Sequence, residues 1–215
     1  MKISYAITVC NELEEITKLL NLLLKRRRKT DEIVVLFDKK SGTPEVWSRL
    51  QELNGEQNCT IHSATFKHHF ADWKNKLSSY CTGDYIFQID ADEYPHETLL
   101  SHLPGILESN PDNEVYLVPR VNTVTDLTPE YIIKWQWKLN DKKWVNYPDY
   151  QWRIWKNKPE IKWKNKVHEV LEGFKKYALL PQQEELSLYH PKDILRQVKQ
   201  NDYYDSLGEI NRTQS

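Results

Sequence analysis

Two aspartates separated by one residue, Asp90 and Asp92, follow directly on the apolar run at residues 85–89. Such a run predicts a buried strand, and alternate residues of an extended chain lie on the same side. The two carboxylates can therefore converge on one ligand. Carboxylate oxygens suit Mg²⁺ or Mn²⁺, which complete their coordination with water and phosphate oxygens. The same pair also occurs in solvated acidic turns, but its place at the mouth of a buried strand favours a site for a metal and a nucleotide.

Polar residues also follow two earlier apolar runs. The run at residues 3–9 leads into Asn11 and Glu12, and the run at 32–37 is closed by Asp38. In an open parallel sheet, ligands bind beyond the carboxyl ends of the strands, where an acid can accept hydrogen bonds from a ribose or a base edge. No glycine-rich phosphate loop follows the first run. A cation on the Asp-x-Asp pair is therefore expected to neutralise the phosphates.

The elements that must position these residues alternate along the first half of the chain. Strands are predicted at residues 3–9, 32–37, 59–62, 85–89 and 115–118. Helices are predicted from Asn11 to about residue 28, at 44–55, at 70–80 and at 97–109. Asn11 and Glu14 have the spacing of a capping box for the first helix. This alternation predicts an α/β fold whose mainly parallel sheet carries helices on both faces.

The second half of the chain has another character. From residue 122 to 163 it is rich in Trp, Lys, Asn and Pro, with short strand-like pieces at 151–155 and 161–163. We expect antiparallel strands and loops that lie over the sheet. Residues 193–207 have the pattern of an amphipathic helix.

Composition limits the possible partners. Lys and Arg total 30 against 31 Asp and Glu, so no global field attracts nucleic acid. Three widely spaced cysteines suit a reduced, cytoplasmic setting. The apolar run at 19–24 is too short to cross a bilayer, and its basic cluster follows rather than precedes it, so we expect no transmembrane or export segment.

Three segments together, at residues 7–12, 32–38 and 83–93, resemble the family 2 glycosyltransferases of the GT-A fold. The resemblance implies one GT-A domain over 1–215, with a Rossmann-like sheet and a smaller antiparallel region. It also implies a nucleotide-sugar-binding half at about 1–120, an acceptor-side half at about 121–190, and a C-terminal helix and tail at 191–215. The implied reaction moves a sugar from a nucleotide-diphosphate sugar, a UDP-sugar by family frequency, to a hydroxyl of a glycan or other acceptor.

The resemblance also implies roles for individual residues. Those expected to bind the nucleotide sugar are Val9, Asn11, Glu12, Asp38, Lys74, Asn75, Asp90, Ala91 and Arg153. Asp92, with Asp90 and His168, is expected to hold Mn²⁺ or Mg²⁺. Some of these residues have an alternative: Lys74 and Asn75 as exposed helix residues, Arg153 as the partner of a structural acid, and His168 as a scaffold residue. The chain departs from the family pattern at residues 39–43, where the usual Ser, Asp and Gly are replaced.

Family 2 enzymes generally invert the sugar, which requires a base for the acceptor hydroxyl. The segment at 167–170 resembles a His-Glu motif of one branch of the family, and it makes Glu169 the first candidate base. Glu93 and Asp149 follow it. His190 either closes the site from the C-terminal side or caps the last helix.

Six of the eight tryptophans lie in the irregular half of the chain. We expect one or two of Trp135, Trp137 and Trp144 to stack on an acceptor sugar and the others to pack in the core. Two alternative functions stay open at this point. One is a metal-dependent nucleotidyltransferase, and the other is a non-catalytic carbohydrate-binding protein.

Overall fold

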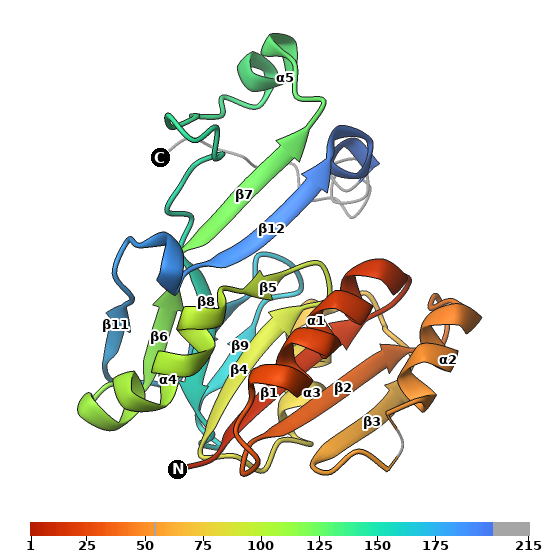
Figure 1. Ribbon diagram of the computed structural model, residues 1–215, viewed down its shortest axis with the longest axis vertical. Helices are drawn as coiled ribbons and strands as arrows, with labels where there is room; N and C mark the ends of the chain where they lie inside the picture. Colours follow the sequence, from red (N-terminus) through yellow and green to blue (C-terminus); the bar gives the residue numbers. More distant parts are fainter. Residues whose placement is uncertain (54, 200–215) are drawn as a thin grey trace.

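The computed structural model describes residues 1–53 and 55–199. Its main sheet has seven strands in the order β11-β6-β8-β4-β1-β2-β3 (Figure 1). The bounds are β1 Ile3–Val9, β2 Glu32–Asp38, β3 Cys59–Ala64, β4 Tyr85–Asp90, β6 Val115–Val118, β8 Gln151–Lys156 and β11 Tyr177–Leu179. β1 runs parallel to both β2 and β4, and β2 runs parallel to β3. The predicted α/β architecture with a mainly parallel sheet is confirmed.

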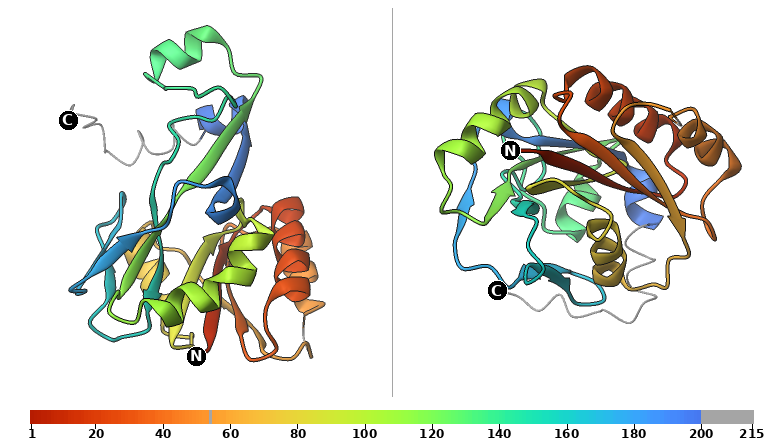
Figure 2. Two further views of the ribbon diagram at one scale, coloured as in Figure 1. Left: turned by 60° about the vertical axis from the view of Figure 1, so that its left-hand side comes forward. Right: turned by 90° about the horizontal axis from the view of Figure 1, so that it is seen from below.

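Helices cover both faces of this sheet. Their bounds are α1 Leu13–Arg26, α2 Pro44–Gln51, α3 Phe70–Ser78 and α4 Glu97–Ser109. α1, α2 and α4 lie on one face, while α3 and the pair β9 Lys162–Lys164 and β10 Val170–Glu172 lie on the other (Figure 2). β2 shows why, since its side chains alternate between the faces. Val35 packs in the cluster that contains α1, and Val34 packs in the cluster that contains α3.

The predicted strand at 151–155 lies inside the sheet and not over it. β8 sits between β4 and β6 and is antiparallel to both. Ile154 and Trp155 are 0% and 2% exposed and belong to the clusters on opposite faces. A strand that is apolar on both faces is stable in the interior of a sheet. The expectation that the whole second half covers the sheet is therefore wrong.

A second sheet rises above the carboxyl ends of β1, β2 and β4. It contains β5 Tyr94–Pro95, β12 Leu188–Asp193 and β7 Arg120–Thr125 in that order. Only Pro119 separates β6 from β7, so one stretch of chain serves both sheets. β12 was not predicted from the sequence. The helix predicted from 193 starts at 194, and its part from 200 onward lies outside the described residues.

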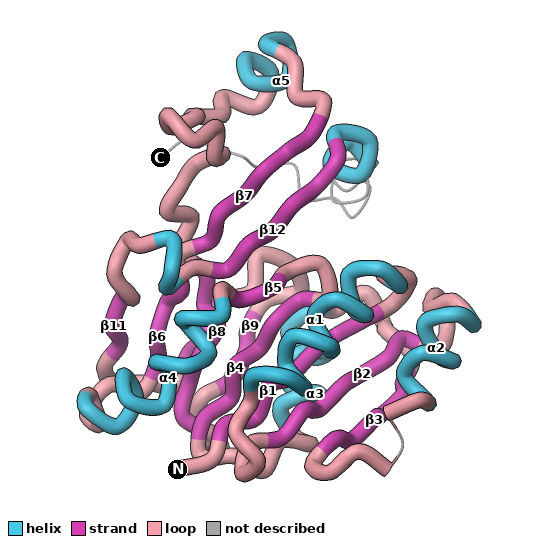
Figure 3. The backbone as a smooth tube through the Cα atoms, in the orientation of Figure 1, coloured by secondary structure: helices cyan, strands magenta, loops and turns pink. Residues whose placement is uncertain are grey.

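Residues 126–146, which form most of the segment between β7 and β8, are called the arm below. It carries the short helix α5 Pro129–Lys134 and is otherwise loop (Figure 3). It stands at the far end of β7, above the main sheet (Figure 1). A short helix η1 Glu184–Leu186 precedes β12. In the part of the chain that the structure describes, no helix is long and apolar enough to cross a membrane.

The start of α1 also differs from the prediction. The helix begins at Leu13, with Glu12 as the capping residue and no side-chain cap. The Glu12 carboxylate instead accepts hydrogen bonds from the backbone N–H groups of Cys10 and Asn11, at 2.8 and 3.0 Å. The predicted capping box between Asn11 and Glu14 is wrong, because the Glu12 side chain accepts the hydrogen bonds of the backbone N–H groups before the helix.

Candidate active site

The carboxyl ends of β1, β2 and β4 meet at one edge of the main sheet, and they bring Val9, Asp38 and Asp90 into one region. Val9 and Asp38 are buried, at 4% and 5% exposure. Asp38 Oδ1 accepts hydrogen bonds from the backbone N–H groups of Lys40 and Phe66, each at 3.1 Å. Asp38 therefore holds together the two loops that follow β2 and β3.

A cavity of about 350 Å³ lies beside Asp38. The residues that line it are Phe37, Lys39, Gly42, Thr43, Pro44, Trp47 and Ser63. The rings of Phe37 and Trp47 are 5.2 Å apart. A Cβ on Gly42 would lie 2.2 Å from the Phe37 ring, so the loop at 39–43 reaches this position only with glycine. The departure from the family pattern at 39–43 thus falls on the wall of a cavity.

Asp90 is held by two neighbouring side chains. Its Oδ1 accepts a hydrogen bond from Gln88 Nε2 at 2.7 Å, and its Oδ2 accepts one from Arg153 Nη2 at 2.6 Å. Burial by itself raises the pKa of Asp90, but the positive charge of Arg153 outweighs burial and holds the pKa well below its usual range. Asp90 is therefore ionised and fixed. Of the two alternatives for Arg153, the structure shows the pairing with acids.

Glu93 is fully buried in an ion-pair network. Its Oε1 lies 2.6 Å from Arg153 Nη2 and 2.9 Å from Arg120 Nη1, and its side chain is 0% exposed. Its Oε2 accepts from the Asp90 backbone N–H at 3.3 Å. A carboxylate that pairs with two guanidinium groups and is 0% exposed has no surface that a substrate hydroxyl can reach. The expectation that Glu93 is a reserve base is corrected: Glu93 holds two arginines behind the site.

Asp149, the other reserve base, belongs to the same network. Arg120 donates to its Oδ2 from Nε and Nη2 at 2.9 and 2.7 Å, and Asn122 donates to the same oxygen at 2.6 Å. Burial by itself raises the pKa of Asp149. The charge of Arg120 and these hydrogen bonds lower it by more, so the pKa lies below its usual value. Asp149 is therefore a poor proton acceptor.

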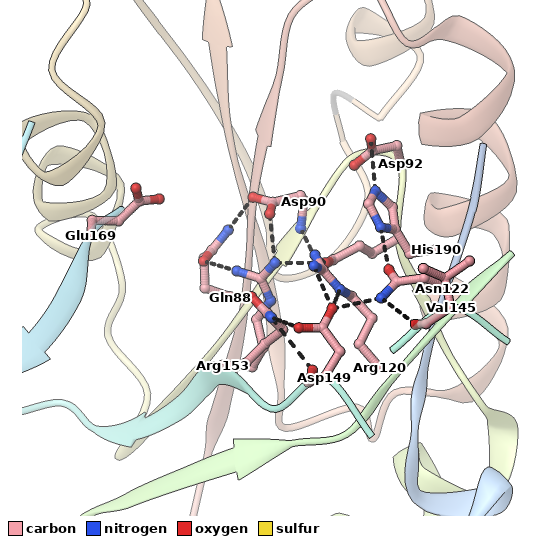
Figure 4. Close-up of polar contacts among 12 residues, drawn as sticks. Gln88, Asp90, Asp92, Arg120, Asn122, Val145, Asp149, Arg153, Glu169 and His190 are labelled. Atoms are coloured by element: carbon pink, nitrogen blue, oxygen red, sulfur yellow. Dashed lines mark hydrogen bonds and ion pairs between the residues drawn. The ribbon is translucent and has the colours of Figure 1, made fainter. Parts of the chain in front are cut away.

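Asp92 has a different environment from Asp90. It lies in the loop between β4 and β5, and His190 Nε2 lies 3.3 Å from its Oδ2 (Figure 4). Arg196 Nη2 lies 3.5 Å from the same oxygen. Burial raises its pKa, but contact with His190 and the charge of Lys192 lower it more. Glu12 lies close enough for the Asp92 charge to raise its pKa, after burial as the main cause. The carboxylates of Glu12 and Asp92 thus lie close to the cationic side chains of Lys192 and Arg196.

Asp92 and His190 are suited to a divalent cation. Across residues 1–53 and 55–199, no group of three or more His, Cys, Asp or Glu side chains is placed to hold a metal ion. A carboxylate and an imidazole nitrogen 3.3 Å apart nevertheless form a pair of ligands of the types that Mn²⁺ accepts. Phosphate oxygens and water commonly complete such a shell.

The predicted third ligand, His168, lies elsewhere. It is exposed and has a left-handed backbone conformation, with φ of 51°. This conformation reorients the chain between β9 and β10, so the simple alternation expected for an extended segment does not apply. The imidazole that the structure places beside Asp92 is that of His190, which the sequence analysis set behind a capping role.

Glu169 lies across Asp90 from Asp92 (Figure 4). Its Oε1 is 2.5 Å from Lys74 Nζ, and this ammonium group lies 4.5 Å from the centre of the Trp163 ring. Lys74 is buried, so the alternative of an exposed helix residue is wrong for it. Asn75 exchanges two hydrogen bonds of 2.9 Å with the backbone of Trp163 and so ties α3 to β9.

The three tryptophans proposed to bind the acceptor differ in exposure. Trp135 and Trp137 in the arm are partly exposed, with ring centres 4.7 Å apart, and Trp135 also stacks on Tyr131 at 4.9 Å. Trp144 is only 9% exposed and packs edge-on against Tyr147. Trp135 and Trp137 therefore have ring surface available to a ligand, while Trp144 is largely covered.

Four polar or charged residues of the site were not predicted from the sequence. They are Arg120, Asn122, Lys192 and Arg196. Arg120 could have been found, because it follows the predicted strand at 115–118 by one proline and so satisfies the strand-end rule. The other three depend on the pairing of β7 with β12, which no local pattern predicts.

Comparison with known proteins agrees with this geometry. The sequence pattern described as "Glycosyl transferase family 2" matches residues 4–175. The chain belongs to this family. The resemblance noted from its strand-end segments is confirmed, and the match favours that family over the alternatives of a nucleotidyltransferase and a non-catalytic carbohydrate-binding protein. No protein with curated annotation matches the sequence at a significant level.

Solved structures of the same fold include those of TarS residues 1–349 from S. aureus. The complex with UDP has a TM-score of 0.63 and 17% identity, over 89% of this chain and 60% of TarS 1–349. The complex with UDP-GlcNAc has a TM-score of 0.57 and 17% identity, over 86% and 60%. A mannosyltransferase from Pyrobaculum calidifontis in complex with GDP-Man and Mn²⁺ has a TM-score of 0.48 and 20% identity, over 55% and 35%. The chain thus spans about 60% of the length of TarS 1–349.

Proposed function

We propose that this glycosyltransferase moves a sugar from a UDP-sugar to a hydroxyl group of a glycan or other acceptor, with inversion at the anomeric carbon. The observation that carries the proposal is the group around Asp92. His190 and Arg196 approach this carboxylate at 3.3 and 3.5 Å, and buried Lys192 also lies in its field. Such a group can bind a diphosphate together with a divalent cation.

Asp92 and His190 are the residues that would hold the metal, and Lys192 and Arg196 are placed to bind phosphate oxygens beside it. A bound Mn²⁺ or Mg²⁺ would stabilise the negative charge that develops on the leaving diphosphate. Asp90 is fixed by Gln88 and Arg153, so its place is on the ribose side of the nucleotide and not on the metal. This division assigns the two aspartates of the motif to different parts of the donor.

The nucleoside is placed in the cavity beside Asp38. The aromatic rings of Phe37 and Trp47 give this cavity a flat apolar wall, which suits a base. UDP is the first nucleotide to test because solved structures of the same fold hold UDP and UDP-GlcNAc.

Glu169 is the proposed base. Glu93 and Asp149 are paired with arginines, whereas the ion-pair partner of Glu169 within the described part of the chain is a lysine. Its position across Asp90 from Asp92 agrees with an in-line displacement, in which the base and the leaving diphosphate lie on opposite sides of the anomeric carbon (Figure 4). An acceptor hydroxyl between Glu169 and the sugar would give its proton to the carboxylate as it attacks.

Thermal unfolding with nucleoside diphosphates tests the proposal. UDP with Mn²⁺ is expected to raise the midpoint of unfolding of the wild type, and UDP alone to raise it much less. Asp92→Ala should abolish the metal-dependent part, whereas Asp112→Ala, at an exposed position, should keep it. A panel of UDP-sugars then identifies the donor by release of UDP. The proposal fails if no nucleoside diphosphate stabilises the wild type in a metal-dependent way.

A further inference from the structure

The ring nitrogen of His190 that faces away from Asp92 is Nδ1, and it contacts a series of polar side chains that begins with Asn122. β12 runs parallel to β7 with His190 opposite Asn122. His190 Nδ1 lies 2.9 Å from Asn122 Oδ1, while Nε2 faces Asp92 (Figure 4). The register of these two strands therefore decides what each ring nitrogen meets.

The orientation of the Asn122 amide follows from its other contacts. Its Nδ2 lies 2.6 Å from Asp149 Oδ2 and 3.5 Å from the backbone oxygen of Val145. Both of these atoms are acceptors, so the NH₂ end of the amide must face them. A flipped amide would set its oxygen against the Asp149 carboxylate. Asn122 Oδ1 therefore faces His190.

Asp149 is surrounded by donors, so it remains an acceptor. Arg120 donates to Oδ2 at 2.7 and 2.9 Å, and Gln151 Nε2 donates to Oδ1 at 2.9 Å. Neither carboxylate oxygen faces an acceptor that would require a proton between the two atoms. The orientation of Asn122 is thus set by an arginine and an aspartate that do not themselves contact His190.

We propose that Asn122, oriented by Asp149 and Arg120, is a positioning residue that keeps the proton of neutral His190 on Nδ1. The lone pair of Nε2 then points at the Asp92 carboxylate. Two acceptors 3.3 Å apart repel each other until a proton or a cation lies between them. The part of this inference that concerns the metal rests on the proposed function, while the part that concerns the proton does not.

Removal of Asn122 should have a specific consequence. Without an acceptor at Nδ1, His190 can move its proton to Nε2 and donate a hydrogen bond to Asp92. That bond would close the place where a cation binds. Second-shell partners of metal-binding histidines typically change metal affinity by roughly 10–100-fold.

Two variants and one control separate positioning from general stability. Asn122→Leu keeps a similar volume and removes the hydrogen bonds. The exchange Asn122→Asp with Asp149→Asn restores an acceptor for Nδ1, because the amide at position 149 can donate to the carboxylate at position 122. Thr123→Ala alters the neighbouring residue of β7, whose side chain points to the other face of the strand.

The first measurement uses metal-free protein labelled with ¹⁵N in histidine, at an alkaline pH that keeps the rings neutral. The signals of His190 are assigned by their loss in His190→Gln. We expect the proton on Nδ1 in the wild type, in the exchanged pair and in Thr123→Ala, and on Nε2 in Asn122→Leu. A proton on Nε2 in the wild type overturns the proposal, and this spectrum requires no variant of Asn122 to fold.

The second measurement is the affinity for Mn²⁺, followed by electron paramagnetic resonance. We expect Asn122→Leu to bind about 10–100-fold more weakly, and the exchanged pair to recover most of the affinity. Equal affinity of Asn122→Leu and the wild type, with weaker binding by His190→Gln, would contradict the role of Asn122. If the wild type binds no Mn²⁺, the metal site of the proposed function is wrong, and the proton position alone decides the role of Asn122.

Discussion

The three acids within residues 90–93 have different sets of partners. Asp90 is bonded to Gln88 and Arg153, Asp92 faces His190, and Glu93 is buried between two arginines. Their side-chain chemistry is nearly the same, so the partners decide which acid can take up a metal and which cannot. Because only Asp92 has an imidazole beside it, the Asp-x-Asp motif supplies one proposed metal ligand rather than two.

Glu169→Gln tests the base at this scale. The amide keeps the size of the side chain and can still accept a hydrogen bond from Lys74, but it cannot take a proton. We expect kcat to fall by about 10²–10⁴-fold, with KM for the donor changed only a few-fold. Steady-state kinetics with the donor that the panel of UDP-sugars identifies measures both values.

Glu172→Gln is the matched control, because Glu172 is exposed on β10 only three residues further along. It should keep the kcat of the wild type. A Glu169→Gln enzyme with more than a tenth of the wild-type kcat would move the role of base to another residue.

At the scale of elements, β12 assembles the site. It pairs with β5 on one side and with β7 on the other, so Tyr189 lies opposite Tyr94 and His190 lies opposite Asn122. A slip of one residue would turn His190 to the other face of the strand. The stacked rings of Tyr94 and Tyr189, with centres 5.1 Å apart, help to fix this register.

The segment that carries Glu169 depends on a glycine. Gly173 directly follows β10 with φ of +87°, and a Cβ there would lie 1.9 Å from the Glu160 backbone oxygen. We expect Gly173→Ala to lower the free energy of unfolding by about 1–3 kcal/mol, because both the backbone conformation and the contact resist a side chain. Urea denaturation measures the change.

Gly105→Ala provides the contrast. Gly105 lies inside α4, and a Cβ there would meet no atom within 4 Å. Alanine is the better helix former, so this variant should be more stable than the wild type by up to about 1 kcal/mol. A Gly173→Ala protein as stable as Gly105→Ala would show that the turn after β10 can rearrange.

At the scale of the whole molecule, the arm stands above the edge of the sheet where we propose the nucleotide site (Figure 2). Its rings offer the surface that sugars commonly stack on. We expect Trp135→Ala and Trp137→Ala to raise KM for the acceptor several-fold. The rate of hydrolysis of the UDP-sugar, in which water replaces the acceptor, should change little. Acceptor titrations of both variants check this expectation, and unchanged saturation in both would exclude the arm from the acceptor site.

Trp144→Ala should act on stability instead. Its ring is 9% exposed, and truncation of a buried tryptophan commonly costs about 3–5 kcal/mol. Thermal unfolding distinguishes this loss from the loss of acceptor binding expected for Trp135 and Trp137.

The sequence by itself determined the first half of the protein, to which we assign the nucleotide. Strands β1, β2 and β4 and the helices between them follow from apolar runs and helical spacing, which are local signals. The carboxyl ends of parallel strands must lie at one edge, so the grouping of Asp38, Asp90 and Asp92 also followed without coordinates. The family resemblance rested on these same segments.

Only the tertiary structure decided how that edge is completed. Arg153 reaches Asp90 across 63 residues of sequence, and His190 reaches Asp92 across 98. β8 enters the main sheet, and β12 joins the second sheet, through pairings that no local pattern specifies. A histidine or an arginine has no preferred partner in sequence, because its role depends on the strand that lies beside it once the sheet has formed.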